Sequence, residues 1–289
     1  MTRVSEQTAP ITPPARSRRG ALRIDEVSKI YDPDGAAVSA VDRCSLRVEA
    51  GEICMIVGPS GCGKTTLLQA IAGFHPISTG TITLDDQVLC STDKPLAKPG
   101  SDRVVVFQNG ALFPWKTNLE NVAFGPLVQG TLTKRAALEK ARGMMAGAGL
   151  TELEHNYPSE VSSGTRRRVE IVRALMNDPK VLLMDEPYRA LDALTRRVMH
   201  GALLELYYRQ PVTMFFITHD LEEAVYLGHK IIVMTTRPCR PKQTIPVTLE
   251  HPRTPEVVTS ARFLALLRET RAAVDEEALK AFQDGEKEG

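Results

Sequence analysis

Short apolar runs without charged residues recur through the middle of this 289-residue chain. They cover residues 53–57, 104–107, 181–184, 214–217 and 231–234. Runs of this length predict strands that are buried on both faces, as in a parallel sheet. Helical patterns separate them, at Leu67, Leu68, Ile71 and Ala72, and again at Leu194, Val198, Ala202 and Leu206. Strands that alternate with helices predict an α/β fold with a parallel sheet.

Other segments alternate between apolar and polar residues, which predicts strands with one exposed face. They are residues 22–27, 45–48, 81–84 and 88–89, with turns at 32–35 and at Asp85-Asp86. We therefore expect an antiparallel sheet beside the parallel one. Residues 112–178 carry few strand patterns, and Leu138, Ala141, Met145 and Ala148 recur there at helical spacing. This predicts a helical subdomain inserted in the α/β core.

The two ends of the chain differ from the main domain, which we expect to span residues 21–250. Residues 1–20 combine prolines and an arginine cluster with few apolar residues, which predicts a disordered tail. A membrane-surface role for these arginines is the alternative. Residues 251–289 are interrupted by prolines and then helical from 262 to 282, which predicts a C-terminal helical extension.

Composition narrows the class of protein. The formal net charge of +1 provides no basic field, which disfavours nucleic acid as a partner. No apolar run approaches the roughly 20 residues that span a bilayer, and the basic N-terminus lacks the apolar core of a secretory signal. The five cysteines show no metal-ligand spacing, as in a reducing compartment. We therefore expect a soluble, cytoplasmic protein.

A glycine-rich loop follows the first apolar run and precedes the first helix. Its sequence from Gly58 to Thr66 fits the phosphate-loop pattern GxxxxGK[ST]. The glycines allow backbone N–H groups to turn toward an anion, and the new helix adds positive charge at its N-terminus. We expect the lysine to reach the β- and γ-phosphates of ATP and the next hydroxyl to bind Mg²⁺. The candidate nucleotide-binding residues are Gly58, Ser60, Gly61, Gly63, Lys64, Thr65 and Thr66.

Polar side chains end two of the other apolar runs. Asp185 and Glu186 follow one, and His219 follows the next. The carboxyl ends of parallel strands line the ligand crevice, so these groups are expected beside the phosphate loop. We predict that Asp185 holds Mg²⁺, that Glu186 orients or deprotonates the attacking water, and that His219 reaches the γ-phosphate. A surface turn with two acids and a structural histidine are the alternative interpretations.

From about residue 22 to about residue 240 the chain resembles the ATP-binding subunits of ABC transporters. Gln108 with Leu112-Phe113-Pro114-Trp115 is similar to the family's glutamine loop, and Ala190-Leu191-Asp192 to the loop where two subunits meet. The resemblance implies a RecA-like P-loop NTPase core. It further implies that Gln108 senses Mg²⁺ and water, that Tyr31 stacks on adenine, and that Ser162 and Gly164 cover the γ-phosphate bound by a second subunit. Tyr31 suits a sheet-capping role as well.

The signature segment, residues 161–165, departs from the family's usual Leu-Ser-Gly-Gly-Gln. It is Val-Ser-Ser-Gly-Thr, and Ser163 adds a β-carbon where glycine would permit a positive φ. Arg189 also stands where close relatives often have glycine. Both departures predict slower or more partner-dependent hydrolysis. The three arginines that follow, 166–168, are interpreted as a solvated helix face, with phosphate contact as the alternative.

Segments 113–117, 192–196, 219–224 and 236–238 look most like the nitrate, sulfonate and taurine importer group. The resemblance implies an ATP hydrolase coupled to transport, in which ATP, Mg²⁺ and two copies of the chain drive uptake of a small nitrogen- or sulfur-containing solute. The implied partners are a membrane permease and, through it, a solute-binding protein. The implied location is the cytoplasmic face of the cell membrane. A regulatory subunit with weak hydrolysis and a soluble ATPase that acts on nucleic acid remain the alternatives.

Overall fold

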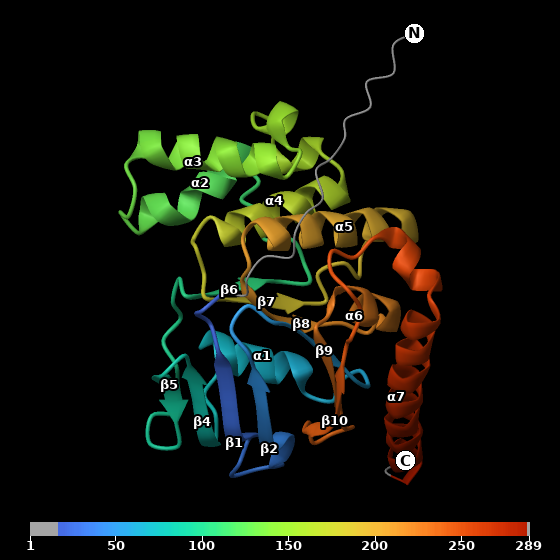
Figure 1. Ribbon diagram of the computed structural model, residues 1–289. Coiled ribbons are helices and arrows are strands. Elements are labelled where there is room, and N and C mark those ends of the chain that lie inside the picture. The colour runs from blue at the N-terminus through green and yellow to red at the C-terminus, as the bar shows by residue number, and fades with distance from the viewer. Residues whose placement is uncertain (1–16, 288–289) are drawn as a thin grey trace.

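The strands form two sheets, a six-stranded one and a four-stranded one (Figure 1). The computed structural model describes residues 17–287. The six-stranded sheet has, from edge to edge, β10 (Pro241–Pro246), β9 (Lys230–Met234), β3 (Ile53–Val57), β8 (Thr213–Ile217), β7 (Val181–Asp185) and β6 (Arg103–Val106). The four-stranded sheet has β2 (Val38–Val48), β1 (Leu22–Tyr31), β4 (Thr79–Leu84) and β5 (Gln87–Ser91).

The six-stranded sheet is parallel from β9 to β6, and only the edge strand β10 runs antiparallel. Its apolar strands are buried on both faces because side chains alternate across a strand. Ile53 and Met55 of β3 pack into one hydrophobic core, whereas Cys54 and Ile56 pack into another on the opposite face. The predicted parallel and antiparallel sheets, and the α/β class, are confirmed.

Helices cover both faces of this sheet (Figure 1). Helix α1 lies between the two sheets and completes the core shared by them. Helices α4, α5, α6 and α7 contribute to the core on the other face. The helices are α1 (Lys64–Ala72), α2 (Asn118–Val128), α3 (Lys134–Gly147), α4 (Ser163–Leu175), α5 (Ala193–Arg209), α6 (Leu221–Leu227) and α7 (Ala261–Lys287), with short 3₁₀ turns at Thr151–Leu153, Pro158–Glu160 and Pro255–Thr259.

The segment between β6 and β7 forms the expected helical subdomain. Helices α2, α3 and α4 have a hydrophobic core of their own, to which the α3 residues Ala141 and Met145 contribute fully buried side chains. In Figure 1 the subdomain stands above the edge of the six-stranded sheet at β6 and β7. Within the described part of the chain, no helix is both long and apolar enough to span a bilayer.

Helix α5 forms where the pattern predicts, but it buries a different face. Leu194 and Val198 are 73% and 53% exposed, whereas Met199, Leu203 and Tyr207 pack against the sheet. A helix turns 100° per residue, so positions four apart drift by about 40° at each step and cannot stay on one face. The every-fourth spacing therefore identified the helix and not its buried side.

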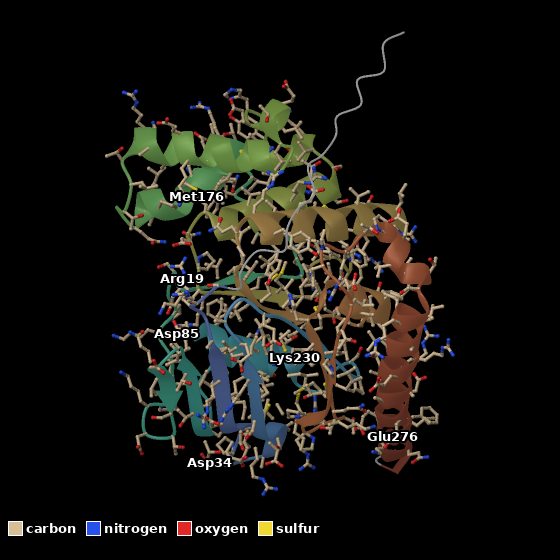
Figure 2. All side chains as sticks on the ribbon, viewed as in Figure 1. Arg19, Asp34, Asp85, Met176, Lys230 and Glu276 are labelled. Atoms are coloured by element: carbon tan, nitrogen blue, oxygen red, sulfur yellow. The ribbon has the colours of Figure 1, made fainter. Side chains whose placement is uncertain are left out.

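The predicted tail, residues 1–20, lies mostly outside the described residues. Arg19 forms an ion pair with Asp178, and the backbone N–H of Gly20 donates to Asp85. Figure 2 shows Arg19 and Asp85 near each other. Lys180 also pairs with Asp85, at 2.8 Å. Together these contacts attach the chain to the core from Arg19 onward. Helix α7 extends beyond the predicted 262–282 to Lys287.

Candidate nucleotide site

The phosphate loop connects β3 to α1 with three glycines in positive-φ conformations. The φ angles are 153° at Gly58, 71° at Gly61 and 118° at Gly63. A β-carbon at Gly63 would lie 2.3 Å from the carbonyl oxygen of Ala40, so both space and conformation require glycine there. The expected curl of the loop is thus present, and α1 begins directly after it at Lys64.

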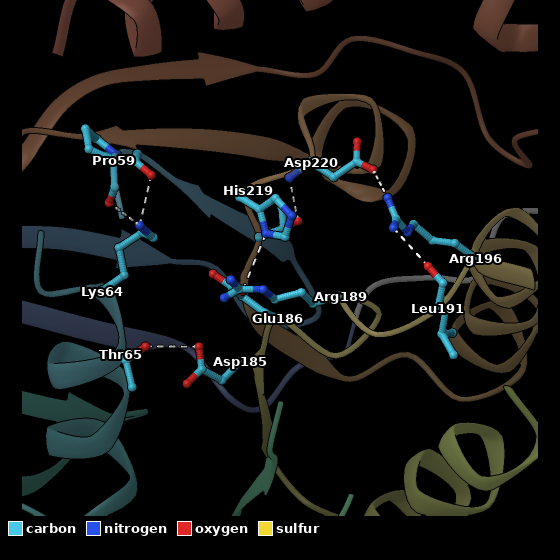
Figure 3. Close-up of polar contacts among 12 residues, drawn as sticks. Pro59, Lys64, Thr65, Asp185, Glu186, Arg189, Leu191, Arg196, His219 and Asp220 are labelled. Atoms are coloured by element: carbon cyan, nitrogen blue, oxygen red, sulfur yellow. Dashed lines mark hydrogen bonds and ion pairs between the residues drawn. The ribbon is translucent and has the colours of Figure 1, made fainter. Parts of the chain in front are cut away.

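Lys64 lies inside this loop and is only 6% exposed. Its Nζ donates to the carbonyl oxygens of Gly58 and Pro59 at 2.9 and 2.7 Å (Figure 3). These bonds hold the ammonium over the loop, where it can exchange backbone oxygens for phosphate oxygens. Ser60, Gly61 and Thr65 are exposed along the loop, and Thr66 is half-buried.

Two of the three predicted Mg²⁺ ligands, Thr65 and Asp185, come from different elements and meet beside the loop. The Thr65 hydroxyl, at the start of α1, donates to Asp185 Oδ1, at the end of β7, at 3.2 Å (Figure 3). Burial raises the pKa of Asp185 despite the Thr65 hydrogen bond, and the charge of Glu186 raises it further. A partly buried carboxylate with a hydroxyl beside it fits an oxygen-seeking divalent cation, which would offset the cost of ionisation.

Glu186 stands at the centre of a second group of contacts. Its Oε2 lies 3.0 Å from Arg189 Nη1 and 3.4 Å from His219 Nδ1. Its backbone has φ 44°, a conformation that side-chain-bearing residues rarely adopt and that is found at functional sites. Figure 3 shows Glu186, Arg189 and His219 close together, beside the Thr65–Asp185 pair. The structure therefore brings together Thr65 and Asp185, which are predicted to hold Mg²⁺, and Glu186, which is predicted to activate water.

Gln108 and Tyr31 lie on other segments. Gln108 follows β6 in a loop, residues 107–116, that contains no helix or strand. Tyr31 ends β1 with its ring 37% exposed, and the Lys29 ammonium lies 4.8 Å from the ring centroid. The exposed ring leaves a face on which a base can stack. Both assigned roles stay predictions.

The signature segment lies in the helical subdomain and not beside the phosphate loop of the same chain. Ser162 caps α4 by accepting a hydrogen bond from the Thr165 backbone at 3.2 Å, and Gly164 packs against Thr195 of α5. The prediction that position 163 favours glycine because of a positive φ is wrong. Ser163 is the first residue of α4 and lacks a positive φ, so its β-carbon needs no special conformation.

The arginine run is not a solvated helix face. Arg167 is 6% exposed, while Arg166 donates to the carbonyl oxygens of Pro158 and Val161 and Arg168 to that of Ala148. All three side chains therefore satisfy backbone carbonyls near the helix. The sequence alone suggested exposure to solvent because three consecutive arginines point to three sides of a helix. It does not show the surrounding loops, whose carbonyl groups accept hydrogen bonds from these arginines.

Arg196 connects two of the predicted functional loops and was not identified from the sequence. Its guanidinium donates to the Leu191 carbonyl at 3.0 Å and to Asp220 at 2.7 Å (Figure 3). Asp220 also caps α6 by accepting from the backbone N–H groups of Glu222 and Glu223. Only the tertiary fold, which places Leu191 and Asp220 side by side, reveals this link.

Replacing Arg189 by alanine is expected to raise basal ATP turnover by up to about fivefold, because the arginine occupies the carboxylate oxygen that would accept the proton of water. An exposed ion pair of this kind contributes about 0.2–1 kcal/mol, and that range sets the size of the effect. Phosphate release by Arg189→Ala is compared with release by Arg197→Ala, which removes an exposed arginine from α5. A lower turnover in Arg189→Ala alone would instead assign the arginine a supporting role.

A glycine-rich loop that holds a lysine, with an Asp-Glu pair and a histidine at the ends of the neighbouring strands, defines a P-loop ATPase. The family model of ABC transporters matches residues 41–189, which is more than half of the chain. The chain belongs to the ABC transporter family, as an ATP-binding subunit with the family's ATPase activity. The predicted membership of the ABC transporter ATP-binding subunits and the predicted ATP hydrolase activity are confirmed.

Three similar proteins illustrate the relation. An uncharacterized ABC transporter ATP-binding protein of Methanocaldococcus jannaschii is 40% identical over 262 residues, covering 91% of this chain and 94% of its own. The taurine import ATP-binding protein TauB of Rhizobium johnstonii is 42% identical over 220 residues, covering 76% and 81%. A solved dimeric structure of an ATP-binding cassette in a post-hydrolysis state, bound to ADP and Pi, is 26% identical and superposes with a TM-score of 0.64, covering 79% and 100%.

Proposed function

We propose that two copies of this chain bind Mg·ATP between them and power a membrane permease that takes up a small nitrogen- or sulfur-containing solute. In each site, Lys64 holds the phosphates and Thr65, Gln108 and Asp185 hold Mg²⁺, which neutralises phosphate charge when bound. Glu186 orients and deprotonates the attacking water, and His219 contacts the γ-phosphate. Ser162 and Gly164 of the second copy cover that phosphate, while Tyr31 stacks on the base.

The division of the site within one chain supports the pairing of two copies. Lys64, Asp185 and Glu186 gather at the carboxyl ends of the parallel strands, whereas Ser162 caps the start of α4 in the helical subdomain. One chain therefore supplies both halves of a site but does not bring them together. The solved cassette with ADP and Pi is itself dimeric, which agrees with this arrangement.

The observation that carries the permease proposal is the surface beside the glutamine loop. Trp115, the chain's single tryptophan, is 70% exposed and packs at one edge against Phe113, whose ring centroid lies 5.5 Å away. Next to it an open apolar groove of about 270 Å³ is lined by Phe107, Phe113 and Phe124. Exposed aromatic side chains around a groove are typical of a binding surface.

The relatives support the proposed class of solute and the proposed location. TauB is named for taurine import, and taurine is a small molecule with both nitrogen and sulfur. By the same resemblance the permease would lie in the cell membrane, with this chain on its cytoplasmic face and a solute-binding protein on the other side. A nucleic-acid target receives no support from the net charge of +1.

Trp115→Ala is expected to abolish co-purification of the permease from membranes, because it removes the largest exposed apolar side chain at the groove. The tagged chain is purified from its native membranes, and the proteins that accompany it are identified and tested for solute binding. The control is Phe282→Ala, which removes a similarly exposed aromatic ring from α7. Capture of no permease by the wild type, or equal capture by Trp115→Ala at an unchanged Tm, would refute the proposed surface.

A further inference from the structure

Three side chains of α4 face the glutamine loop. Arg167, Glu170 and Arg173 are spaced three residues apart, so they lie along one side of the helix. The loop they face, residues 107–116, has no helix or strand of its own, and its backbone groups need partners from elsewhere. The sequence pattern placed Arg167 on a solvated helix face and gave Glu170 and Arg173 no role.

The contacts of Arg167 and Glu170 are made to the loop backbone. Arg167 donates to the carbonyl oxygens of Phe107 and Gln108, both at 2.7 Å. Glu170 Oε1 accepts a hydrogen bond from the Ala111 backbone at 2.7 Å, and a β-carbon at Gly110 would lie only 3.1 Å from this oxygen. The pair therefore holds the loop on both sides of its turn.

The two side chains also bind each other in a buried ion pair. Arg167 Nη1 lies 2.6 Å from Glu170 Oε2, and the side chains are only 7% and 5% exposed. Burying two charges costs several kcal/mol per ion unless the geometry is good and the remaining donors and acceptors are satisfied. Here the loop backbone supplies those partners. An apolar pair of similar size would fill the same space but would leave the backbone groups of Phe107, Gln108 and Ala111 without these partners, so the two charges serve the loop and not only the packing of the helix.

Arg173 extends the same contact toward the surface around Trp115 that is proposed to bind the permease. Its guanidinium donates to the Ala111 carbonyl at 2.8 Å and lies 5.5 Å from the ring centroid of Phe113. Ser162, which is proposed to cover the partner copy's phosphate, caps the start of the same helix five residues before Arg167, about 7.5 Å along its axis. One rigid helix thus connects Ser162, Gln108 and the surface around Trp115.

We propose that Arg167 and Glu170 are positioning residues that fix Gln108 to α4, so that the glutamine loop and Ser162 move as one body. This inference rests on the proposed function, in which Gln108 serves the chain's own site and Ser162 the partner's. A displacement of the loop by the permease is then transmitted to both ATP sites of the dimer. The pair holds the backbone of Gln108 and leaves its side-chain amide free for Mg²⁺ and water.

The test uses a double variant, Arg167→Met with Glu170→Leu, which removes both charges without leaving one buried alone. Its kcat is expected to fall about 10- to 100-fold, because a misplacement of about 1 Å at a catalytic group has effects of this size. The Mg²⁺ concentration for half-maximal activity is expected to rise, while the Kd for a fluorescent ATP analogue stays unchanged. The control is Arg142→Met with Glu154→Leu, an ion pair of the same subdomain that does not contact the loop.

Two further measurements separate positioning from a structural role. In a Gln108→Ala background the double variant is expected to cause no further loss, because the group it positions is already absent. Hydrogen exchange of the Ala111 amide is expected to accelerate while the amides of α4 stay protected. Additive losses with Gln108→Ala, an unchanged kcat, or a parallel fall of ATP affinity and Tm would overturn the inference alone. A wild type that does not hydrolyse Mg·ATP would overturn the proposed function and this inference together.

Discussion

Replacing Glu186 by glutamine is expected to lower ATP turnover by at least about 10²-fold, the lower end of what a general base contributes. The amide keeps the size of the carboxylate but cannot accept a proton from water. The carboxylate has the required surroundings: it lies within 3.4 Å of His219 and next to the Thr65–Asp185 pair, on a backbone held at φ 44°. Turnover is measured as phosphate release with Mg·ATP present, with and without the permease.

The same substitution is expected to stabilise the paired state. The substitution leaves intact the proposed phosphate contacts of Lys64 and the proposed cover by Ser162. ATP bound to Glu186→Gln is then not consumed and should keep two copies together. Light scattering with Mg·ATP then shows a dimer mass for Glu186→Gln. Glu205→Gln, which neutralises an exposed acid of α5, provides the control and should behave as the wild type. A Glu186→Gln protein that stays monomeric, both in solution and on the permease, would refute the shared site. Equal turnover of variant and wild type, both negligible even with the permease, would favour the regulatory alternative.

The conformation of the phosphate loop was predictable because local chemistry determines its geometry. A charge-free run such as 53–57 is compatible with few structures other than a buried strand, and a loop with glycines at 58, 61 and 63 before a helix has few conformations. Strands that alternate with helices run parallel, so the carboxyl ends that carry Asp185, Glu186 and His219 are expected at the same end of the sheet. These predictions depend on short segments and on rules that hold in most folds.

Contacts between distant segments were not predictable in this way. The ion pair of Arg167 and Glu170 could be suspected from its spacing of three residues, but its acceptors at Phe107 and Gln108 lie some 60 positions away. The exposed side of α5 depends on which face meets the sheet, and periodicity does not reveal this when Leu194 and Tyr207 are both apolar. Sequence periodicity therefore identifies elements, whereas the pairing of their faces requires the tertiary structure.

Asp185→Asn is expected to raise the Tm of the nucleotide-free protein while lowering Mg·ATP hydrolysis by about 10²-fold or more. Burial raises the pKa of Asp185 above its ordinary value, so the folded chain binds a proton there more tightly than the unfolded chain. The ionised carboxylate consequently destabilises the folded state above that raised pKa. The asparagine removes this charge and still offers an oxygen to the Thr65 hydroxyl.

The pH dependence distinguishes this cause from a general packing effect. The stabilisation by Asp185→Asn should be largest at neutral pH and should vanish as pH falls below the ordinary carboxyl range near about 3.9, where the wild-type group is protonated in both states. Asp178→Asn should behave oppositely, because the Arg19 hydrogen bond and charge lower the pKa of Asp178. The Asp178 carboxylate therefore stabilises the folded state at neutral pH, and this contribution is lost as pH falls. Mg·ATP should raise the Tm of the wild type more than that of Asp185→Asn. If Mg·ATP stabilises both equally, Asp185 does not hold the metal, and the site needs another ligand.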